Sequence, residues 1–271
     1  MDKRPIGVFD SGLGGLTAVR ELRRILPGED LVYFGDTGRI PYGTRGQATI
    51  LQYARQDIRF LLGQGVKCIM AACGTVSSIY PAAEAGALPV PYLGVVDTAA
   101  RAAACATQNG RVGVIGTPAT IKSGSYQRAL AQLLPHAAVT ARACPMFVPL
   151  VENGYVAPGD PVALAIAHEY LDEVRGAGVD TLILGCTHYP LLTDIIGHIM
   201  GPGVTLINTG EEAAWELKRT LRGLDLLAPE GPAGRATLCA SDQPEQFGVM
   251  ASYFLGESLT RPVQPVDIDR Y

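Results

Sequence analysis

The sequence lacks the long apolar run that a membrane-spanning helix needs, since no stretch of about 18 consecutive apolar residues occurs in its 271 residues. We also expect no secretory signal. Residues 1–5 lead directly into the apolar segment Ile6–Phe9, which is too short for the apolar region of a signal peptide. We therefore expect a cytoplasmic protein with no membrane partner.

The chain also has little excess of one sign of charge over the other. The 22 basic and 26 acidic residues give a formal net charge of −4, and no Lys/Arg cluster occurs. Such a chain has no electrostatic footprint for nucleic acid. Because 48% of the residues are hydrophobic, the chain can bury a core and is not disordered. This composition favours a small-molecule partner, and it is compatible with a homodimer.

The usual motifs of metal and cofactor sites are missing as well. No C-x-x-C pair occurs, and no Cys/His group has zinc spacing. The glycine-rich segment at residues 12–15 lacks the Lys and following Ser/Thr of a Walker motif, and no G-x-G-x-x-G pattern occurs. No lysine is a clear anchor for pyridoxal phosphate. We therefore expect neither a metal nor a cofactor. Most of the six cysteines should be reduced residues of the core, namely Cys68, Cys105, Cys144 and Cys239.

Short apolar runs alternate with longer helical patterns along the chain. The runs show no polar/apolar alternation, which predicts strands covered on both faces, at residues 6–9, 31–34, 68–72, 92–96, 112–115, 181–184 and 204–207. Helices are expected between them, at about residues 15–25, 49–64, 98–108, 124–134, 161–177 and 211–222. This alternation predicts an α/β fold with parallel sheets, whose sites form at the carboxyl ends of the strands.

The chain also resembles itself. Residues 6–12 (IGVFDSG) are similar to residues 112–118 (VGVIGTP), and residues 72–75 (ACGT) are similar to residues 185–188 (GCTH). The two matches occur in the same order and at nearly the same offset. They favour two similar parallel-sheet α/β domains related by pseudo-twofold symmetry, with the active site in the cleft between them. One larger doubly wound sheet is the alternative.

Each half carries a cysteine at the end of a strand, Cys73 in the first and Cys186 in the second. If the halves face each other, the two thiols enter one cleft from opposite sides. Two such groups suit a reaction that removes a proton from one face of a carbon and returns a proton to the other face. A thiolate can serve as the base, because positive neighbours or a helix N-terminus lower the ordinary cysteine pKa of about 8.5.

Polar residues beside these positions point to the same cleft. Asp10 and Ser11 follow the first strand, and the glycines after them allow the backbone to approach a ligand closely. Asp10 suits an ammonium group or a proton relay. His188 lies two residues after Cys186 and has an ordinary pKa of about 6.5, so it can exchange protons at neutral pH. The other histidines are expected to be solvated, namely His136, His168 and His198.

At these residues the chain resembles the cofactor-independent glutamate racemases. Four ordered segments carry the resemblance over nearly the whole chain: IGVFDSGLGGLT (6–17), YFGDT with PYG (33–37 and 41–43), CPMFVPLVE (144–152) and LGCTHYPL (184–191). The segment FVPLVE favours the glutamate racemases over the related aspartate racemases.

The resemblance implies a first domain of residues 1–97 and 208–271 and a second domain of residues 98–207. It implies cofactor-free interconversion of L- and D-glutamate, which supplies D-glutamate for peptidoglycan. Cys73 and Cys186 would be the two bases, with Asp10 assisting near Cys73 and His188 assisting near Cys186. The substrate would be held by a wider set, namely Asp10, Ser11, Tyr42, Gly43, Gly74, Thr75, Glu152, Thr187 and His188.

One position departs from the family pattern. Members usually have asparagine after the first cysteine, where this chain has Gly74. Because that asparagine helps to bind the substrate, a two-cysteine racemase or isomerase of another acid stays open as an alternative. A non-catalytic binding protein on the same fold is disfavoured, since both cysteines, Asp10 and His188 are present. We expect Gly74→Asn to fold normally and to keep or improve activity on glutamate.

Overall fold

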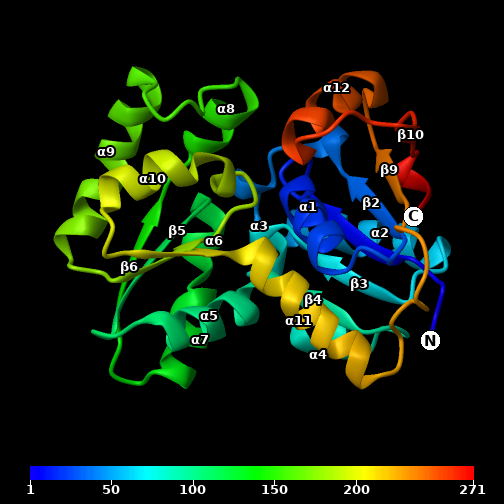
Figure 1. Cartoon of the computed structure of the whole chain (residues 1–271), viewed down its shortest axis with the longest axis horizontal. Helices are drawn as coiled ribbons and strands as arrows, with labels where there is room; N and C mark the ends of the chain where they lie inside the picture. Colours follow the sequence, from blue (N-terminus) through cyan, green and yellow to red (C-terminus); the bar gives the residue numbers. More distant parts are fainter.

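The structure, a computed structural model that describes all 271 residues, consists of two α/β halves that lie side by side (Figure 1). The six-stranded half contains a parallel sheet in the order β10-β9-β2-β1-β3-β4. Its strands are β1 (Ile6–Asp10), β2 (Leu31–Gly35), β3 (Cys68–Ala71), β4 (Tyr92–Gly94), β9 (Ala236–Ala240) and β10 (Gln264–Pro265).

The four-stranded half contains a second parallel sheet in the order β6-β5-β7-β8. Its strands are β5 (Arg111–Gly116), β6 (Ala138–Ala143), β7 (Thr181–Leu184) and β8 (Thr205–Asn208). In both halves the first four strands lie in the spatial order second, first, third, fourth. The prediction of two similar parallel-sheet α/β halves is therefore confirmed, and the alternative of one larger sheet is wrong.

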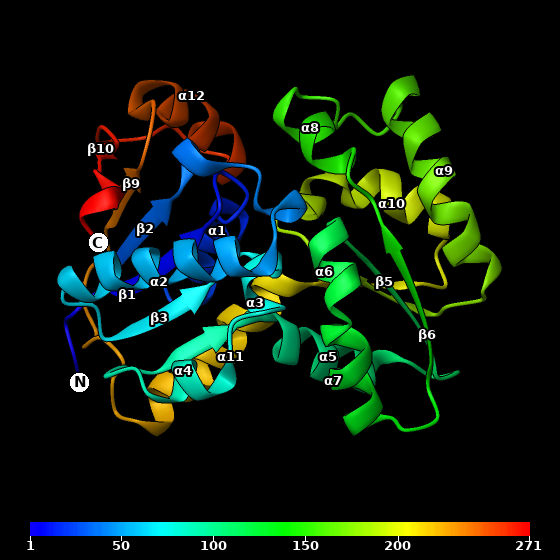
Figure 2. The ribbon, with the colours of Figure 1, turned by 180° about the vertical axis from the view of Figure 1, so that it is seen from behind.

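Helices cover both faces of each sheet. In the six-stranded half α2 covers the face that is toward the viewer in Figure 2, while α1, α11 and α12 cover the other. In the four-stranded half α5 and α7 pack on one face and α9 and α10 on the other. The helices are α1 (Leu16–Ile25), α2 (Gln47–Gly63), α3 (Gly74–Ser77), α4 (Ala82–Gly86), α5 (Val95–Ala106), α6 (Pro118–Ser123), α7 (Ser125–Leu133), α8 (Phe147–Glu152), α9 (Pro161–Gly176), α10 (Thr193–Met200), α11 (Thr209–Gly223) and α12 (Pro244–Leu255). None of them combines the length and apolarity that crossing a membrane would require.

The pleat of the strands divides the core into layers. Successive side chains of a strand point to opposite faces, so Phe9 packs toward α2 whereas Val8 packs toward α1. Both side chains are fully buried. This two-sided burial explains why the central strands are continuous apolar runs.

The predicted helices and strands agree with the observed ones to within about three residues at each end. Asp160 begins α9, because its carboxylate accepts hydrogen bonds from the backbone N–H groups of Val162 and Ala163 at 2.9 Å. Asn208 caps α11 in the same way. Several elements were not predicted, namely β6, β9, β10, α3, α4, α6, α8, α10 and α12.

Two further predictions concern single residues and boundaries. The prediction that Cys105 is buried is wrong, because it lies on the exposed side of α5, whereas Cys68, Cys144 and Cys239 are buried. The predicted division into residues 1–97 with 208–271 and residues 98–207 stays a prediction. All six strands of the first sheet fall in the first part, and β5 to β8 fall in the second apart from Asn208.

A buried ion pair stabilises the edge of the six-stranded sheet that is opposite the strands' carboxyl ends. Lys67 and Glu29, which are 1% and 4% exposed, precede β3 and β2 and form an ion pair. The Lys67 ammonium also donates to the Asp2 carbonyl oxygen at 2.9 Å, and Glu29 accepts from the Ala228 N–H at 2.7 Å. The pair therefore ties the N-terminal segment and the connection between α11 and β9 to the sheet.

We expect Lys67→Ala to lower the free energy of unfolding by about 3–5 kcal/mol, because it leaves the Glu29 carboxylate buried without its partner. Urea unfolding measures the change. Arg55→Ala is the matched control, since it removes an exposed pair with Glu84 and should change stability much less. Equal losses in the two variants would contradict the role assigned to the buried pair.

Candidate active site

A cavity of about 360 Å³ lies between the two halves, at the carboxyl ends of their strands. Loops that follow β1, β2 and β3 form one side of it, and loops that follow β5 and β7 form most of the other. Its lining includes all the predicted site residues except Asp10, namely Ser11, Tyr42, Gly43, Cys73, Gly74, Thr75, Glu152, Cys186, Thr187 and His188. The two cysteines thus line one cavity from opposite halves.

Cys73 lies between β3 and α3 and is 4% exposed. Its thiol donates a hydrogen bond to the Ser11 hydroxyl, with 3.7 Å between Sγ and Oγ. Burial, together with the nearby Asp10 carboxylate, raises the pKa of the Cys73 thiol to about 12. In the free protein Cys73 is therefore a neutral thiol and a proton donor.

Cys186 belongs to a line of three polar groups. Its Sγ lies 3.9 Å from Nδ1 of His188, and Nε2 of His188 lies 2.9 Å from a carboxylate oxygen of Glu152 in α8. Burial opposes a charged imidazole, but the hydrogen bonds to Cys186 and Glu152 prevail and raise the pKa of His188 to about 10. A cation beside Sγ stabilises negative charge on the sulfur, so this arrangement favours Cys186 as the base.

Asp10 lies behind the cavity wall rather than in it. It is 1% exposed and does not line the cavity. Its carboxylate accepts hydrogen bonds from the Gly12 N–H at 3.1 Å and from the Thr187 hydroxyl at 3.4 Å. Burial raises its pKa, although the neighbouring His188 opposes this shift. Asp10 thus reaches the loop of Cys186 as well as the surroundings of Cys73.

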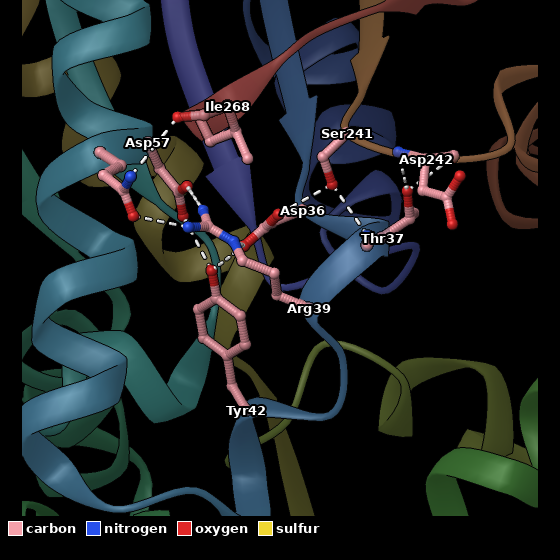
Figure 3. Close-up of polar contacts among 10 residues, drawn as sticks. Asp36, Thr37, Arg39, Tyr42, Asp57, Ser241, Asp242 and Ile268 are labelled. Atoms are coloured by element: carbon pink, nitrogen blue, oxygen red, sulfur yellow. Dashed lines mark hydrogen bonds and ion pairs between the residues drawn. The ribbon is translucent and has the colours of Figure 1, made fainter. Parts of the chain in front are cut away.

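The hydroxyl of Tyr42 points away from the cavity and into a buried polar cluster (Figure 3). The hydroxyl donates to Asp36 and also lies 3.2 Å from Asp57. Arg39 joins the two carboxylates, at 2.6 Å from Asp36 and 3.1 Å from Asp57, and the Ser241 hydroxyl after β9 donates to Asp36 at 2.8 Å. Burial and the two carboxylates raise the pKa of Tyr42. Its ring therefore forms the wall, and its hydroxyl fixes the wall to α2 and β9.

Thr117 is a site residue that the sequence analysis did not identify. It follows β5, lines the cavity and lies with its hydroxyl oxygen 3.0 Å from that of Thr75. In the internal match of residues 6–12 with residues 112–118, Thr117 occupies the position of Ser11. The repeat therefore contained the signal that could have identified it.

The prediction that Gly74→Asn folds normally and keeps or improves activity stays a prediction, and the structure shows which contact opposes it. A Cβ atom at position 74 would lie 2.3 Å from the carbonyl oxygen of Gly185, which precedes Cys186. A backbone atom cannot rotate out of the way, so either Gly74 or the opposite loop would have to move. The prediction that the other three histidines are solvated is confirmed, since His136, His168 and His198 are exposed.

Comparison with known proteins identifies the family. The family model described as Asp/Glu/Hydantoin racemase matches residues 6–217. The chain belongs to this family. No group of three or more His, Cys, Asp or Glu side chains in the structure could hold a metal ion.

Three relatives illustrate the similarity. A glutamate racemase of Geobacter metallireducens is 44% identical over 259 residues, which cover 96% of this chain and 95% of that protein. The crystal structure of glutamate racemase from Francisella tularensis in complex with D-glutamate matches with a TM-score of 0.90 and 37% identity, covering 100% of both chains. That of glutamate racemase from Thermus thermophilus in complex with beta-chloro-D-alanine matches with a TM-score of 0.89 and 45% identity, again over 100% of both chains.

The position of the Tyr42 hydroxyl generates a prediction. Tyr42→Phe should lower the free energy of unfolding by about 1–3 kcal/mol, because Asp36 and Asp57 lose a buried donor. The KM for the substrate should stay close to that of the wild type, since the hydroxyl does not face the cavity. A large rise in KM with unchanged stability would show instead that the hydroxyl contacts the substrate.

The His188 environment generates a second prediction. Because the folded-state pKa of about 10 lies above the ordinary value of 6.5, the protonated ring stabilises the fold fully below pH 6.5, and this stabilisation is lost as the pH rises through 10. NMR of the ring nitrogens should find His188 protonated between roughly pH 6 and 9. Glu152→Gln should lower its pKa, because the ring loses its carboxylate partner. Titration of the wild-type ring near pH 6.5 would contradict this assignment.

Proposed function

We propose that this protein is a glutamate racemase, an isomerase that interconverts L- and D-glutamate with two cysteines as acid and base. The observation that carries the proposal is the placement of Cys73 and Cys186 in opposite walls of one cavity, each after the third strand of its half. The Francisella tularensis relative with bound D-glutamate supports glutamate as the substrate over another acid. The small cavity is of a size that suits such a molecule.

The difficult step is removal of the α-proton, which is weakly acidic beside a carboxylate. We propose that no cofactor takes part, so the carbanion is stabilised by positioning and by fixed hydrogen-bond donors. Hydroxyl groups from both halves line the cavity and can supply such donors, namely those of Ser11, Thr75, Thr117 and Thr187. Exclusion of water by the two halves strengthens each of these interactions.

The two thiols differ before substrate binds. Cys73 carries its proton, whereas Cys186 faces the protonated ring of His188. In one direction Cys186 therefore takes the α-proton and Cys73 donates its own proton to the opposite face of the carbon. The other direction uses the reverse pair of protonation states, in which Cys73 is the thiolate and Cys186 the thiol.

The remaining predicted site residues have supporting roles in this proposal. The protonated ring of His188 stabilises negative charge on the sulfur of Cys186, and Glu152 orients that ring. Asp10 positions the loop of Cys186 through the Thr187 hydroxyl. Gly43 and the ring of Tyr42 form the wall beside the substrate.

The same proposal covers the protein's place in the cell. We propose that it acts in the cytoplasm, where its product D-glutamate serves peptidoglycan synthesis. A homodimer also stays a prediction, and sedimentation velocity is the measurement that tests it.

Cys73→Ala and Cys186→Ala should each abolish racemisation in both directions, because the reaction needs a base on one face and an acid on the other. Polarimetry or a chiral assay with each glutamate enantiomer measures the loss. Cys105→Ala is the matched control, since that thiol is exposed on α5 and should leave the rate unchanged. Turnover near the wild-type rate in either of the first two variants would end the two-base proposal.

Isotope exchange tests the geometry of the same step. In D2O each enantiomer should give a product with deuterium at the α-carbon, while the remaining substrate gains little deuterium early in the reaction. The reason is that the donating thiol has already exchanged with the solvent and stands on the face opposite to the base. Rapid early deuteration of the recovered substrate would point to a single base.

A further inference from the structure

Phe254 is a buried aromatic residue that lies behind the site and has no part in the mechanism described above. It belongs to α12, which packs on the six-stranded sheet (Figure 1), and its side chain is fully buried. The centroid of its ring lies 5.5 Å from that of the His188 ring, and the planes of the two rings are at 89°. Phe254 therefore packs, from the opposite half, against the imidazole that stands beside Cys186.

The sequence of α12 explains how this ring reaches the other half. Phe247 and Phe254 are seven residues apart, which is about two turns of an α-helix, so both lie on the buried face of α12. The ring of Phe247 stacks on that of Tyr33 in β2, with 6.3 Å between the centroids, and anchors the beginning of the helix to the sheet. Phe254, in the last turn, meets His188 in the loop after β7 instead. One helix thus connects the six-stranded sheet to the imidazole.

Polar groups hold both nitrogens of the His188 ring. Nδ1 lies 3.9 Å from Sγ of Cys186, and Nε2 lies 2.9 Å from a carboxylate oxygen of Glu152. The Asp10 carboxylate is the third charged group near the ring, whereas α12 presents the uncharged ring of Phe254. The contacts to Cys186 and Glu152 need the same orientation of the imidazole plane, so rotation of the ring about its Cβ–Cγ bond breaks both of them together.

The perpendicular contact with Phe254 favours that one orientation. Aromatic rings attract each other edge to face at centroid separations of about 4.5–7 Å, and the observed geometry falls in this range. An imidazole that turned away from Cys186 would lose this contact as well. The apolar ring of Phe254 also fills space that water would otherwise occupy beside the imidazole. The attraction between a protonated imidazole and a thiolate is stronger where water is excluded.

We propose that Phe254 is a positioning residue that holds the His188 imidazole in line with the sulfur of Cys186, so that the protonated ring stabilises the thiolate. This inference rests on the two-cysteine racemisation proposed above and adds a residue that does not line the cavity. It also gives α12 a role in the chemistry. The placement of this helix on the six-stranded sheet determines how well the acid–base group of the four-stranded half is aligned.

The test compares Phe254→Leu with Phe247→Leu as the matched control. Both substitutions shorten a buried phenylalanine on the same face of α12, so both should lower the melting temperature. Of the two rings, that of Phe254 packs on His188 and that of Phe247 packs on Tyr33. For Phe254→Leu we expect kcat to fall about tenfold, which is less than the hundredfold loss that misplacement by about 1 Å can cause. KM should change less than kcat, because the residues that line the cavity stay in place.

Two further readouts separate positioning from a general loss of stability. NMR of the ring nitrogens should show that Phe254→Leu lowers the pKa of His188 from about 10 toward the ordinary value of 6.5, because a misaligned ring loses the hydrogen bonds that raise it. The acidic limb of the pH profile of kcat/KM should move to higher pH, because a misaligned ring stabilises the thiolate less. Phe247→Leu should keep the wild-type His188 pKa and the wild-type pH profile.

Folded Phe254→Leu with the wild-type His188 pKa and the wild-type pH profile would overturn the inference, and so would equal shifts in Phe247→Leu. If Phe254→Leu does not fold, Phe254→Met decides by the same measurements, because methionine fills much of the space but has no ring. If the wild type does not racemise glutamate, the proposed function fails. The His188 pKa of the variant then still shows whether Phe254 holds the imidazole, and an unchanged pKa overturns the inference in that case too.

Discussion

Parallel strands of one sheet carry all their carboxyl ends on the same edge, and every feature of the site depends on this constraint. In each half the third strand lies beside the first, so the loops after them meet at that edge. The two edges face each other, which brings Cys73 and Cys186 to one cavity although the two residues lie 113 positions apart in the chain. The cavity is a property of the two facing edges.

Neither loop alone could bring two thiols together over that distance. The packing of the two sheets does so, because it turns both carboxyl edges toward the same space.

Two thiols of the same chemistry acquire different properties from their surroundings. Burial and the Asp10 carboxylate raise the pKa of Cys73 to about 12, whereas Cys186 faces the ring of His188, which Glu152 holds. A racemase works in both directions, so the protonation states of the two thiols have to be opposite in the two directions. The cluster around Arg39 keeps two further carboxylates paired and out of the cavity, so their charge is not presented to an acidic substrate.

Much of the fold could be predicted from the sequence, because central strands of parallel sheets are buried on both faces and form continuous apolar runs. The unpredicted strands lack that signal. The residues of β6 are mostly half-buried, since it is an edge strand, and β9 follows a segment rich in proline and glycine. Cys105 was predicted to be buried because cysteine usually is, but its position on α5 faces solvent.

The sequence by itself determined the positions of the central strands, the repeat that relates the halves, and the residue types at the site, including both cysteines and His188. Only the tertiary structure decided that Glu152 holds His188 across 36 residues of sequence, that the Tyr42 hydroxyl turns to Asp36, and that Gly74 lies against Gly185. The physical reason is that local patterns report periodicity and burial along one segment. Distances between groups on different segments are set by how the two sheets and their helices pack together.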